Sequence, residues 1–337
     1  MQKRRTKHFP YWKTFFVVLQ QFVLLLRFPI STNRILLNMK TIKIWIQASR
    51  LASQSYIFMP ILLGQAYWVF LGNKIDWIAF ALIHLFGLFN QLYIVYSNDY
   101  ADRNDDKKNT MPTMFSGGSR VLVENLLAPS KLKAAGIVMA VLCIASGFVF
   151  TIAYQHVYML PLIFFALLLL WLYSFEPAKL SYRGGGEVLQ TIGTAIVLPV
   201  LGFYAQSGNL AAFPWYILVA VVPTSYACAI ATAIPDEPAD RSYNKRTMPV
   251  LIGLVGAKAL VIILNVISTF VFYLLIGSFQ SQVVSVIFLA LPPLSILLSI
   301  INFKAKPGTG KIAAFGLSAI LTTISIIGGM AFYFFGF

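Results

Sequence analysis

The chain has 337 residues, of which 58% are apolar and 11% charged, and its mean hydropathy is +0.77. This composition excludes an ordinary soluble domain with a charged, wetted surface. A net charge of +15 would indicate a nucleic-acid partner in a soluble protein, so the apolar runs have to be placed before the charge is interpreted. Cys143 and Cys228 both lie inside apolar stretches, which indicates neither a disulfide framework nor a thiolate metal site.

Residues 1–44 are predicted to form an N-terminal extension that is both basic and apolar. The segment MQKRRTK leads into FFVVLQQFVLLL, an apolar run that is too short to span a bilayer. No small-residue cleavage site follows Leu26, so the pattern favours an interfacial segment over a signal peptide. Met39 is an alternative start of the chain.

Nine apolar runs then follow, and a spanning helix needs about 20 such residues. The sequence therefore predicts an all-α polytopic membrane protein with nine transmembrane helices in one domain, residues 45–337. The termini of the nine-helix domain should lie on opposite sides of the membrane. The runs are Ala52–Leu71, Ile78–Asn98, Ala134–Tyr154, Val157–Phe175, Val188–Gln206, Phe213–Ile234, Val250–Ile276, Val283–Ile301 and Ile312–Phe335.

Most basic residues fall in one set of connections between these runs. Ten of the 26 Lys and Arg precede the first run, and those in the loops lie in alternate connections except for Lys74. Because Lys and Arg are retained in the cytoplasm, the N-terminus and the long loops are expected there. The net charge is then explained by topology and by contact with anionic lipid headgroups, and no nucleic-acid partner is needed.

Acidic residues are concentrated at the ends of the second and sixth runs, both on the predicted cytoplasmic side. If the second helix continues past Asn98, offsets of three and four residues put Asp99, Asp102 and Asp106 on one face and point Asp105 away. The seven residues of the two clusters are Asp99, Asp102, Asp105, Asp106, Asp236, Glu237 and Asp240.

The second cluster is interrupted by prolines. Pro235 and Pro238 forbid one uninterrupted helix through Asp236 and Asp240. A new helix that begins near Pro235 tolerates both prolines, because the N–H groups of a first turn have no partner within the helix. The sequence therefore predicts a helix break at this point.

Clustered carboxylates repel one another unless a cation lies between them. Hard oxygen ligands in this number suit Mg²⁺, which commonly bridges carboxylates to substrate phosphates, and two facing clusters suggest a diphosphate. Basic residues after each cluster are candidates to hold phosphoryl oxygens. The alternative is that the acids are solvated turns and that the cations only orient the protein. These basic residues are Arg103, Lys107, Lys108, Arg120, Arg241, Lys245 and Arg246.

Two connecting loops are rich in glycine. In the loop between the fourth and fifth runs, Tyr173, Lys179 and Arg183 are placed to reach a polar substrate, or else to form an aromatic belt with snorkelling cations. The segment Ser116-Gly-Gly-Ser-Arg120 is either a phosphate-facing nest or a flexible loop.

Taken together, these residues resemble the UbiA superfamily of intramembrane prenyltransferases. The family's NDxxDxxxD motif stands here from Asn98 to Asp106, and its DxxxD motif at Asp236 and Asp240. Tyr173 and Lys179 represent its YxxxxxK-type loop. The similarity runs from about Trp45 to the C-terminus.

The resemblance implies a helical bundle around a central, lipid-open cavity and transfer of a polyprenyl chain from an allylic diphosphate to an aromatic acceptor. Mg²⁺ is the implied cofactor, and an active site facing the cytoplasm of a bacterial inner membrane is expected. The implied metal ligands are Asp99, Asp102, Asp106, Asp236 and Asp240. The implied catalytic residues are Asp102, Asp236, Tyr173 and Lys179, and the implied substrate-binding residues are Asn98, Arg120, Arg183, Lys245 and Arg246.

Within the superfamily, two segments look most like the 1,4-dihydroxy-2-naphthoate polyprenyltransferases of menaquinone synthesis: 116–124 and 180–187. One departure is Thr232-Ala-Ile-Pro235, where many members carry Asn and Arg, and it keeps 4-hydroxybenzoate, homogentisate and other acceptors open. An ion-coupled transporter is the alternative of a different class, but its acids are expected nearer the bilayer midplane.

Overall fold

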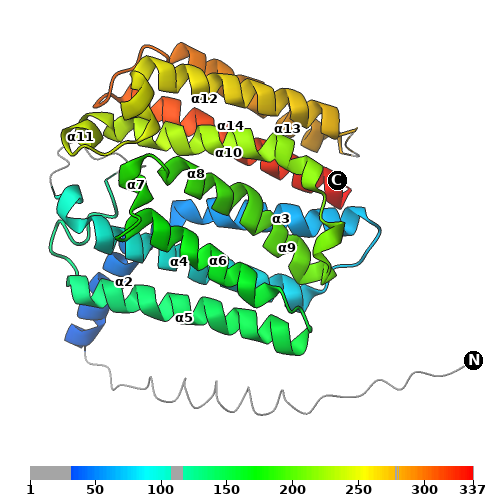
Figure 1. Ribbon diagram of the computed structural model, residues 1–337, viewed down its shortest axis with the longest axis horizontal. Coiled ribbons are helices and arrows are strands. Elements are labelled where there is room, and N and C mark those ends of the chain that lie inside the picture. The colour runs from blue at the N-terminus through cyan, green and yellow to red at the C-terminus, as the bar shows by residue number, and fades with distance from the viewer. Residues whose placement is uncertain (1–31, 108–116, 278, 280, 337) are drawn as a thin grey trace, which may run out of the picture. The chain divides into compact units, whose positions relative to one another are not determined.

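The computed structural model describes residues 32–107, 117–277, 279 and 281–336 (Figure 1). These residues fall into two units, one that ends at Trp45 and one that starts at Ile46. The predicted interfacial segment FFVVLQQFVLLL and the rest of residues 1–31 lie outside the described residues. The described part is all-helical, which agrees with the predicted fold class.

Helices account for nearly all of the second unit, and several of them are composite. The sixth predicted run, for example, begins in a 3₁₀ turn, and the fifth passes through a π-helical turn. The elements are α2 (Thr32–Ser49), η1 (Leu51–Gln54), α3 (Ser55–Phe70), α4 (Trp77–Asp106), α5 (Pro129–Ala153), α6 (Met159–Ser174), α7 (Leu180–Arg183), α8 (Gly186–Thr191), η2 (Ile192–Val197), α9 (Leu198–Ser207), η3 (Leu210–Ala212), η4 (Trp215–Ile217), α10 (Leu218–Ala233), η5 (Ile234–Asp236), α11 (Glu237–Ser242), α12 (Met248–Leu275), α13 (Gln282–Ile301) and α14 (Gly310–Phe335).

Each of the nine predicted runs coincides with a helical segment of the described chain. Seven segments are long and apolar enough to cross a membrane: α4, α5, α8–α9, η4–α11, α12, α13 and α14. The other two, α3 and α6, have 16 residues each and therefore extend about 24 Å, less than the roughly 30 Å of a hydrocarbon core. Nine full membrane spans therefore remain a prediction.

Several pairs of helices pack on one another within the second unit. Helix α5 packs on α4, α9 and α14 pack on α3, and α10 packs on α12 and α14 (Figure 1). The contact between α3 and α9 is unusually close, because a Cβ at Gly64 would lie 2.0 Å from the carbonyl oxygen of Pro199, and one at Gly202 would lie 2.1 Å from that of Ile61. Small residues that let backbones approach are a common means of packing helices in a membrane.

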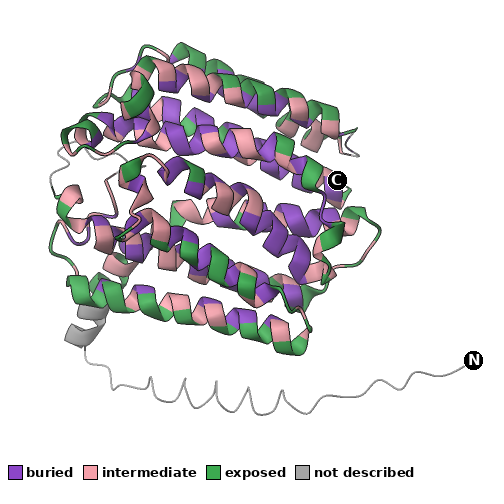
Figure 2. Cartoon of the chain, viewed as in Figure 1, coloured by how far each residue is buried: buried purple, intermediate pink, exposed green. Residues whose placement is uncertain are grey.

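The outer helices carry apolar side chains on their exposed faces. Figure 2 shows exposed residues concentrated along α5, α12 and α13, whereas α10 and α14 are mostly buried. Val255, Phe270, Leu274 and Ile301 are each more than 60% exposed. A helix that is apolar on its exposed face as well as its buried one suits a lipid environment. The unit is therefore built as an integral membrane protein.

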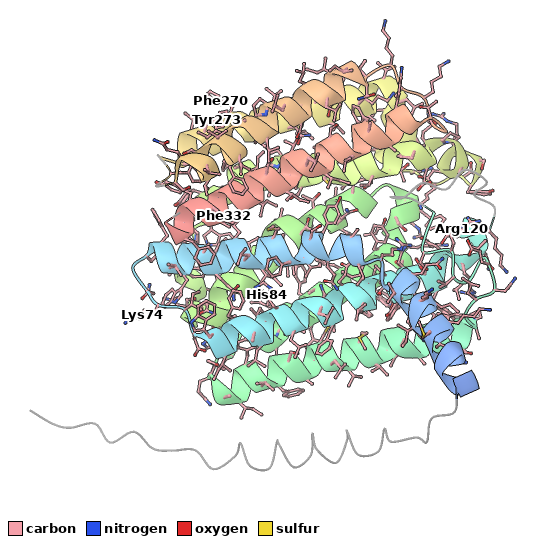
Figure 3. All side chains as sticks on the ribbon, turned by 180° about the vertical axis from the view of Figure 1, so that it is seen from behind. Lys74, His84, Arg120, Phe270, Tyr273 and Phe332 are labelled. Carbon is pink, nitrogen blue, oxygen red and sulfur yellow. The ribbon has the colours of Figure 1, made fainter. Side chains whose placement is uncertain are left out.

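The two ends of the bundle differ in chemistry. Figure 3 shows Lys74 in the short connection at one end and Arg120 at the opposite end. The aspartates at the end of α4 and on η5 and α11 lie in one cavity together with Gly117, close in sequence to Arg120. The acidic motifs and the glycine-rich loop therefore share one end of the bundle.

Candidate active site

The two aspartate motifs border a single cavity. The first motif lies on the last turns of α4, and the second lies on η5 and α11. The break at Pro235 and Pro238 takes the predicted form, since each proline occupies the first or second position of its short helix. The cavity measures about 390 Å³ with its open mouth. It is lined by Asp102, Asp105, Asp106, Gly117, Tyr182, Asp236, Ala239, Asp240, Tyr243 and Lys245.

Asp105 belongs to this cavity, so the prediction that it points away from the other carboxylates is wrong. Asp102 and Asp105 are three residues apart on α4 and therefore neighbours on its surface. The hydroxyl of Tyr182 donates to both: it lies 3.3 Å from Asp102 Oδ1 and forms a short hydrogen bond with Asp105 Oδ2. Tyr182 thus joins the two carboxylates across the cavity wall.

Tyr182 also positions two lysines. Lys179 Nζ lies 3.7 Å and Lys245 Nζ 4.9 Å from the centre of its ring, which is the range of a cation–π contact. Burial and the carboxylates Asp102 and Asp105 raise the pKa of the Tyr182 phenol above its usual value, so the phenol keeps its proton and acts as a donor. The sequence predicted roles for Lys179 and Lys245, but it did not indicate that the ring of Tyr182 contacts both.

Lys245 provides the positive charge of the cavity lining. Its Nζ lies 3.6 Å from Asp240 Oδ1, and the hydroxyl of Thr247 donates to the other oxygen of Asp240 over 3.1 Å. Burial alone would lower the pKa of Lys245, but Asp240 and Asp102 outweigh it and raise the pKa above its usual value. Lys245 is therefore a fixed cation between the two motifs.

Asp99 lies outside the cavity lining. It is buried and paired with Arg50, whose guanidinium donates to Oδ1, while Oδ2 accepts from the backbone N–H of Ser119 at 3.1 Å and from the Ser119 hydroxyl. One buried charge is thus satisfied within the protein. Of the five aspartates predicted to bind metal, the other four border the cavity.

The glycine-rich loop closes on the end of α4. A Cβ at Gly118 would lie 2.3 Å from Asp106 Oδ2, and the backbone at Gly117 and Gly118 has φ of +79° and +72°. Only glycine adopts this conformation readily and leaves room for the carboxylate. Arg120 donates to the backbone carbonyl of Asp106 over 3.0 Å, so it contacts the predicted site through the backbone of that residue.

Asn98 and Tyr173 are absent from the cavity lining. Asn98 Oδ1 accepts from the Ser174 hydroxyl at 3.0 Å. The ring of Tyr173 packs on Gly186, where a Cβ would approach it to 3.2 Å, and its carbonyl accepts from Ser181 at 2.7 Å. These contacts fix the end of α6 beside α4 and α8.

Two predicted substrate-binding arginines lie away from the cavity lining. The side chain of Arg183 is 58% exposed, and its guanidinium pairs with Glu176 at 3.3 Å. Arg246 is exposed, and its backbone N–H donates to the carbonyl of Tyr182 over 3.0 Å. In this structure neither arginine lines the cavity that the aspartates border.

The residues that sequence reasoning missed are Asp105, Tyr182, Arg50, Ser119 and Glu187. Glu187 is buried, and its carboxylate accepts from the backbone N–H of Met248 at 2.8 Å, which satisfies a donor at the start of α12. Arg50, a cation with no Asp or Glu near it in the sequence, was a usable signal for a long-range pair.

The donor set suits a magnesium ion that takes further ligands from a phosphate. Within the described ranges, no three His, Cys, Asp or Glu side chains are close enough to hold an ion by themselves. Asp102, Asp106, Asp236 and Asp240 instead border the cavity from two sides. Mg²⁺ is usually bound through one or two carboxylates together with substrate phosphates and water, which fits this arrangement.

Comparison with known proteins agrees with this geometry. The sequence model of the UbiA prenyltransferase family matches residues 57–332, which contain both aspartate motifs. The chain belongs to the UbiA prenyltransferase family. It is therefore a prenyltransferase, and the match spans every helix from α4 to α13. A search of curated proteins found no match.

Solved structures of UbiA homologues share the fold. An apo homologue from Aeropyrum pernix K1 is 17% identical, with a TM-score of 0.59 over 81% of this chain and 98% of its own. A homologue from Archaeoglobus fulgidus bound to DMAPP and Mg²⁺ is 17% identical, with a TM-score of 0.59 over 85% of this chain and 98% of its own. The same homologue bound to GPP and Mg²⁺ is 18% identical, with a TM-score of 0.58 over 85% of this chain and 99% of its own.

Proposed function

We propose that this UbiA-family enzyme transfers a polyprenyl chain from an allylic diphosphate to an aromatic acceptor in a Mg²⁺-dependent reaction. The observation that carries the proposal is the single cavity bordered by both aspartate motifs and by Lys245. The Archaeoglobus fulgidus homologue with DMAPP or GPP and Mg²⁺ supports the substrate class and the cofactor.

Asp102, Asp106, Asp236 and Asp240 would hold Mg²⁺ against the diphosphate. When bound, the ion neutralises charge on the diphosphate and so makes it a better leaving group. Asp99, although part of the family motif, acts in this proposal through its pair with Arg50 and its hydrogen bonds to Ser119. These contacts tie α4 to the glycine-rich loop beside the cavity.

Lys245 and Lys179 would stabilise the departing diphosphate. In the transfer, the allylic C–O bond breaks and the diphosphate leaves with the electron pair. An electron-rich ring carbon then forms the new C–C bond. The ring regains aromaticity when that carbon loses a proton, or CO₂ if it carries a carboxylate, and the electrons of the broken bond return to the ring. Cations fixed before the reaction stabilise the developing negative charge most effectively, and Tyr182 holds both lysines in place.

For the acceptor we propose 1,4-dihydroxy-2-naphthoate, which would place the enzyme in menaquinone synthesis. Support comes from the sequence of segments 116–124 and 180–187, and the second forms the loop that carries Tyr182 and Glu187. Because Thr232-Ala-Ile-Pro235 departs from the pattern of many members, 4-hydroxybenzoate and homogentisate belong in the same test.

For the location we propose a bacterial inner membrane, with the aspartate cavity facing the cytoplasm. Support comes from the distribution of Lys and Arg, since Lys74 is at the end opposite to Arg120 (Figure 3). A tag at the C-terminus should then be digested by protease added to intact spheroplasts, whereas protection of that tag would reverse the orientation.

The decisive experiment supplies membranes that contain the full chain with labelled polyprenyl diphosphate, either Mg²⁺ or EDTA, and the three acceptors in turn. We expect a prenylated product only with Mg²⁺ and only with dihydroxynaphthoate. A product with another acceptor would refute the menaquinone assignment and leave the reaction in place. Absence of both product and pyrophosphate release, in protein shown to be folded, would refute the reaction.

A further inference from the structure

The second aspartate motif lies on a segment that cannot fix its own geometry. Helix α11, which carries Asp240, has only six residues, and a helix this short is not stable by itself. The residues that follow it, 243–247, form a turn and then have no regular secondary structure. The direction of the Asp240 carboxylate therefore depends on contacts from neighbouring segments.

Thr247 holds one oxygen of the Asp240 carboxylate. Its hydroxyl donates to Asp240 Oδ2 over 3.1 Å, and both residues are buried. Lys245 Nζ lies 3.6 Å from the other oxygen, Oδ1. Lys245 also borders the cavity and serves the diphosphate in the proposed function, whereas Thr247 is absent from the cavity lining. Thr247 is thus the partner that serves Asp240 alone.

Thr247 occupies a position where its hydroxyl usually has another use. It is the N-cap residue of α12, and an N-cap threonine ordinarily accepts from the backbone N–H of the second or third helical residue. In the described structure the Thr247 side chain forms no such bond. Pro249, the second residue of α12, has no N–H, which leaves Val250 as the donor within its reach. The start of α12 has to be satisfied by another group.

Glu187, from a different part of the chain, satisfies the start of α12. Its Oε1 accepts from the backbone N–H of Met248, the first residue of α12, at 2.8 Å. Glu187 is 5% exposed, and in the part of the chain that the structure describes it forms no ion pair with Lys or Arg. Its charge lies instead at the N-terminus of α12, where free N–H groups favour a carboxylate.

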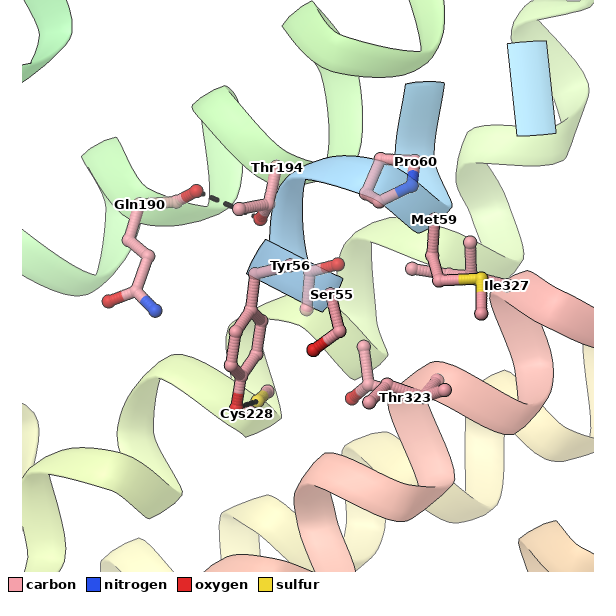
Figure 4. Close-up of a pocket in the computed structure, with 11 residues that line it drawn as sticks. Ser55, Tyr56, Met59, Pro60, Gln190, Thr194, Cys228, Thr323 and Ile327 are labelled. Atoms are coloured by element: carbon pink, nitrogen blue, oxygen red, sulfur yellow. Dashed lines mark hydrogen bonds between the residues drawn. The ribbon is translucent and has the colours of Figure 1, made fainter. Parts of the chain in front are cut away.

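The helix that carries Glu187 gives it a firm support. One turn beyond Glu187, the hydroxyl of Thr194 donates to the carbonyl of Gln190 over 2.9 Å, beside a small cavity between α3, α8–η2, α10 and α14 (Figure 4). Before Glu187, the carbonyl of Tyr182 accepts from the backbone N–H of Arg246 at 3.0 Å. The α7–α8 loop thus holds the segment before α12 at two backbone N–H groups, those of residues 246 and 248.

We propose that Glu187 is a positioning residue for the second aspartate motif: it caps α12 in place of Thr247 and so leaves the Thr247 hydroxyl to align Asp240. The inference rests on the proposed Mg²⁺-dependent function, and Glu187 itself is absent from the cavity lining. Without an acceptor at position 187, α12 would recruit the Thr247 hydroxyl to cap Val250. Asp240 would then lose a hydrogen bond, and a metal-binding carboxylate that loses such support holds its ion less tightly.

The test measures the Mg²⁺ concentration that gives half-maximal binding of labelled geranyl diphosphate, an allylic diphosphate, to full-length protein in nanodiscs. Equilibrium dialysis against empty nanodiscs corrects for partition into lipid. Glu187→Met keeps the size of the side chain and removes the acceptor, so it should raise this concentration by about 3- to 10-fold, the contribution of one hydrogen bond. Glu187→Gln keeps an acceptor oxygen and should stay within about twofold of the unsubstituted protein.

A double variant decides whether Glu187 acts through Thr247. Thr247→Val removes the hydroxyl and should raise the half-maximal Mg²⁺ concentration by about 3- to 10-fold. Glu187→Met/Thr247→Val should match Thr247→Val, because the hydroxyl that Glu187 leaves to Asp240 is already gone. Effects that multiply in the double variant would overturn the proposal. An unchanged Mg²⁺ requirement in Thr247→Val would overturn it as well, even where Glu187→Met does not fold.

Asp76→Ala is the matched control for a merely structural role. The Asp76 carboxylate caps the start of α4, where it accepts from the backbone N–H of Ile78 at 2.8 Å and of Ala79 at 3.0 Å. The aspartate cavity borders the other end of α4. Loss of this cap should lower the melting temperature, as Glu187→Met also should, and leave the Mg²⁺ requirement unchanged. An equal rise in the Mg²⁺ requirement of Asp76→Ala would show that loss of any helix cap produces it and would overturn the proposal.

Failure of the positioning role and failure of the proposed function are distinguishable. If the unsubstituted protein binds geranyl diphosphate only with Mg²⁺, and Glu187→Met does so at the same Mg²⁺ concentration, the positioning role is wrong and the proposed function stands. If the unsubstituted protein binds geranyl diphosphate equally in Mg²⁺ and EDTA, or does not bind it, the proposed function is wrong and the positioning role falls with it.

Discussion

The two aspartate motifs carry the same side chain on different backbones. The first lies on the regular end of α4, where Asp99 is neutralised by Arg50 outside the cavity lining. The second lies on two short helices broken by prolines, where Asp240 pairs with Lys245 inside the cavity. In the first motif the paired cation supports the structure, whereas in the second it is available to a ligand.

This difference teaches that membership in a motif does not by itself assign a carboxylate its role. Asp99 and Asp102 lie one turn apart on α4 and are both buried, yet only Asp102 borders the cavity. Asp99 is satisfied by Arg50 and Ser119 outside the cavity lining, whereas Asp102 borders the cavity and can be reached by a metal ion. Substitutions at these positions should therefore lower turnover by different amounts.

The largest effect is expected for Asp102→Asn and Asp236→Asn, one from each motif. Each removes a charged oxygen ligand that has no substitute in its position, so turnover should fall by about 10²–10³-fold or more. The measurement is product formation at saturating Mg²⁺ in membranes with matched amounts of protein. Near-normal turnover in both variants would refute the metal–diphosphate arrangement.

Next in size is Lys245→Gln. Loss of the fixed cation removes stabilisation of the departing diphosphate and leaves Asp240 without its ion pair, so kcat should fall by about 10²-fold. The matched control is Lys131→Gln, an exposed lysine on α5. If Lys245→Gln changed only KM for the acceptor, the cation would have no role at the diphosphate.

A smaller effect is expected for Asp99→Asn, about tenfold in kcat with a lower thermal transition, because Arg50 loses its partner. The double variant Arg50→Gln/Asp99→Asn should regain stability. The readouts are turnover and melting of the purified protein. A loss as large as that of Asp102→Asn, without a change in melting, would show that Asp99 is itself a metal ligand.

Tyr182→Phe should lower kcat by about 3- to 10-fold, since it removes the hydrogen bonds to Asp102 and Asp105 but keeps the ring under the lysines. Tyr182→Leu, which removes the ring as well, should lower it further. Equal effects of the two variants would assign the function of Tyr182 to the hydroxyl alone.

The smallest effect is expected for Arg183→Gln. Arg183 pairs with Glu176 at an exposed position, and surface pairs contribute little. Turnover should change by less than about twofold. A loss of tenfold or more in KM for the prenyl diphosphate would show that Arg183 moves to the substrate when it binds.

The apolar runs predicted the positions of the helices closely. A membrane segment has to satisfy its backbone polar groups within itself, so a long apolar run in the sequence indicates one helix. The helix break at Pro235 was predictable for the same local reason. The roles of Asp105, Asp99 and Arg183 were not, because each depends on a partner or position that only the folded chain defines. For Asp105 and Asp99 that partner is distant in sequence: Tyr182 and Arg50 respectively.

The close contact between α3 and α9 has a consequence for how the protein is made. Gly64 and Gly202 bring together two helices that leave the ribosome at very different times, so α3 must wait in the bilayer until α9 has been inserted. Both helices border later elements, and a chain arrested before α9 would expose the notch at Gly64 to lipid. The contact between α3 and α9 therefore forms only after the chain has been made as far as Ser207, whereas the contact of α3 with α4 can form earlier.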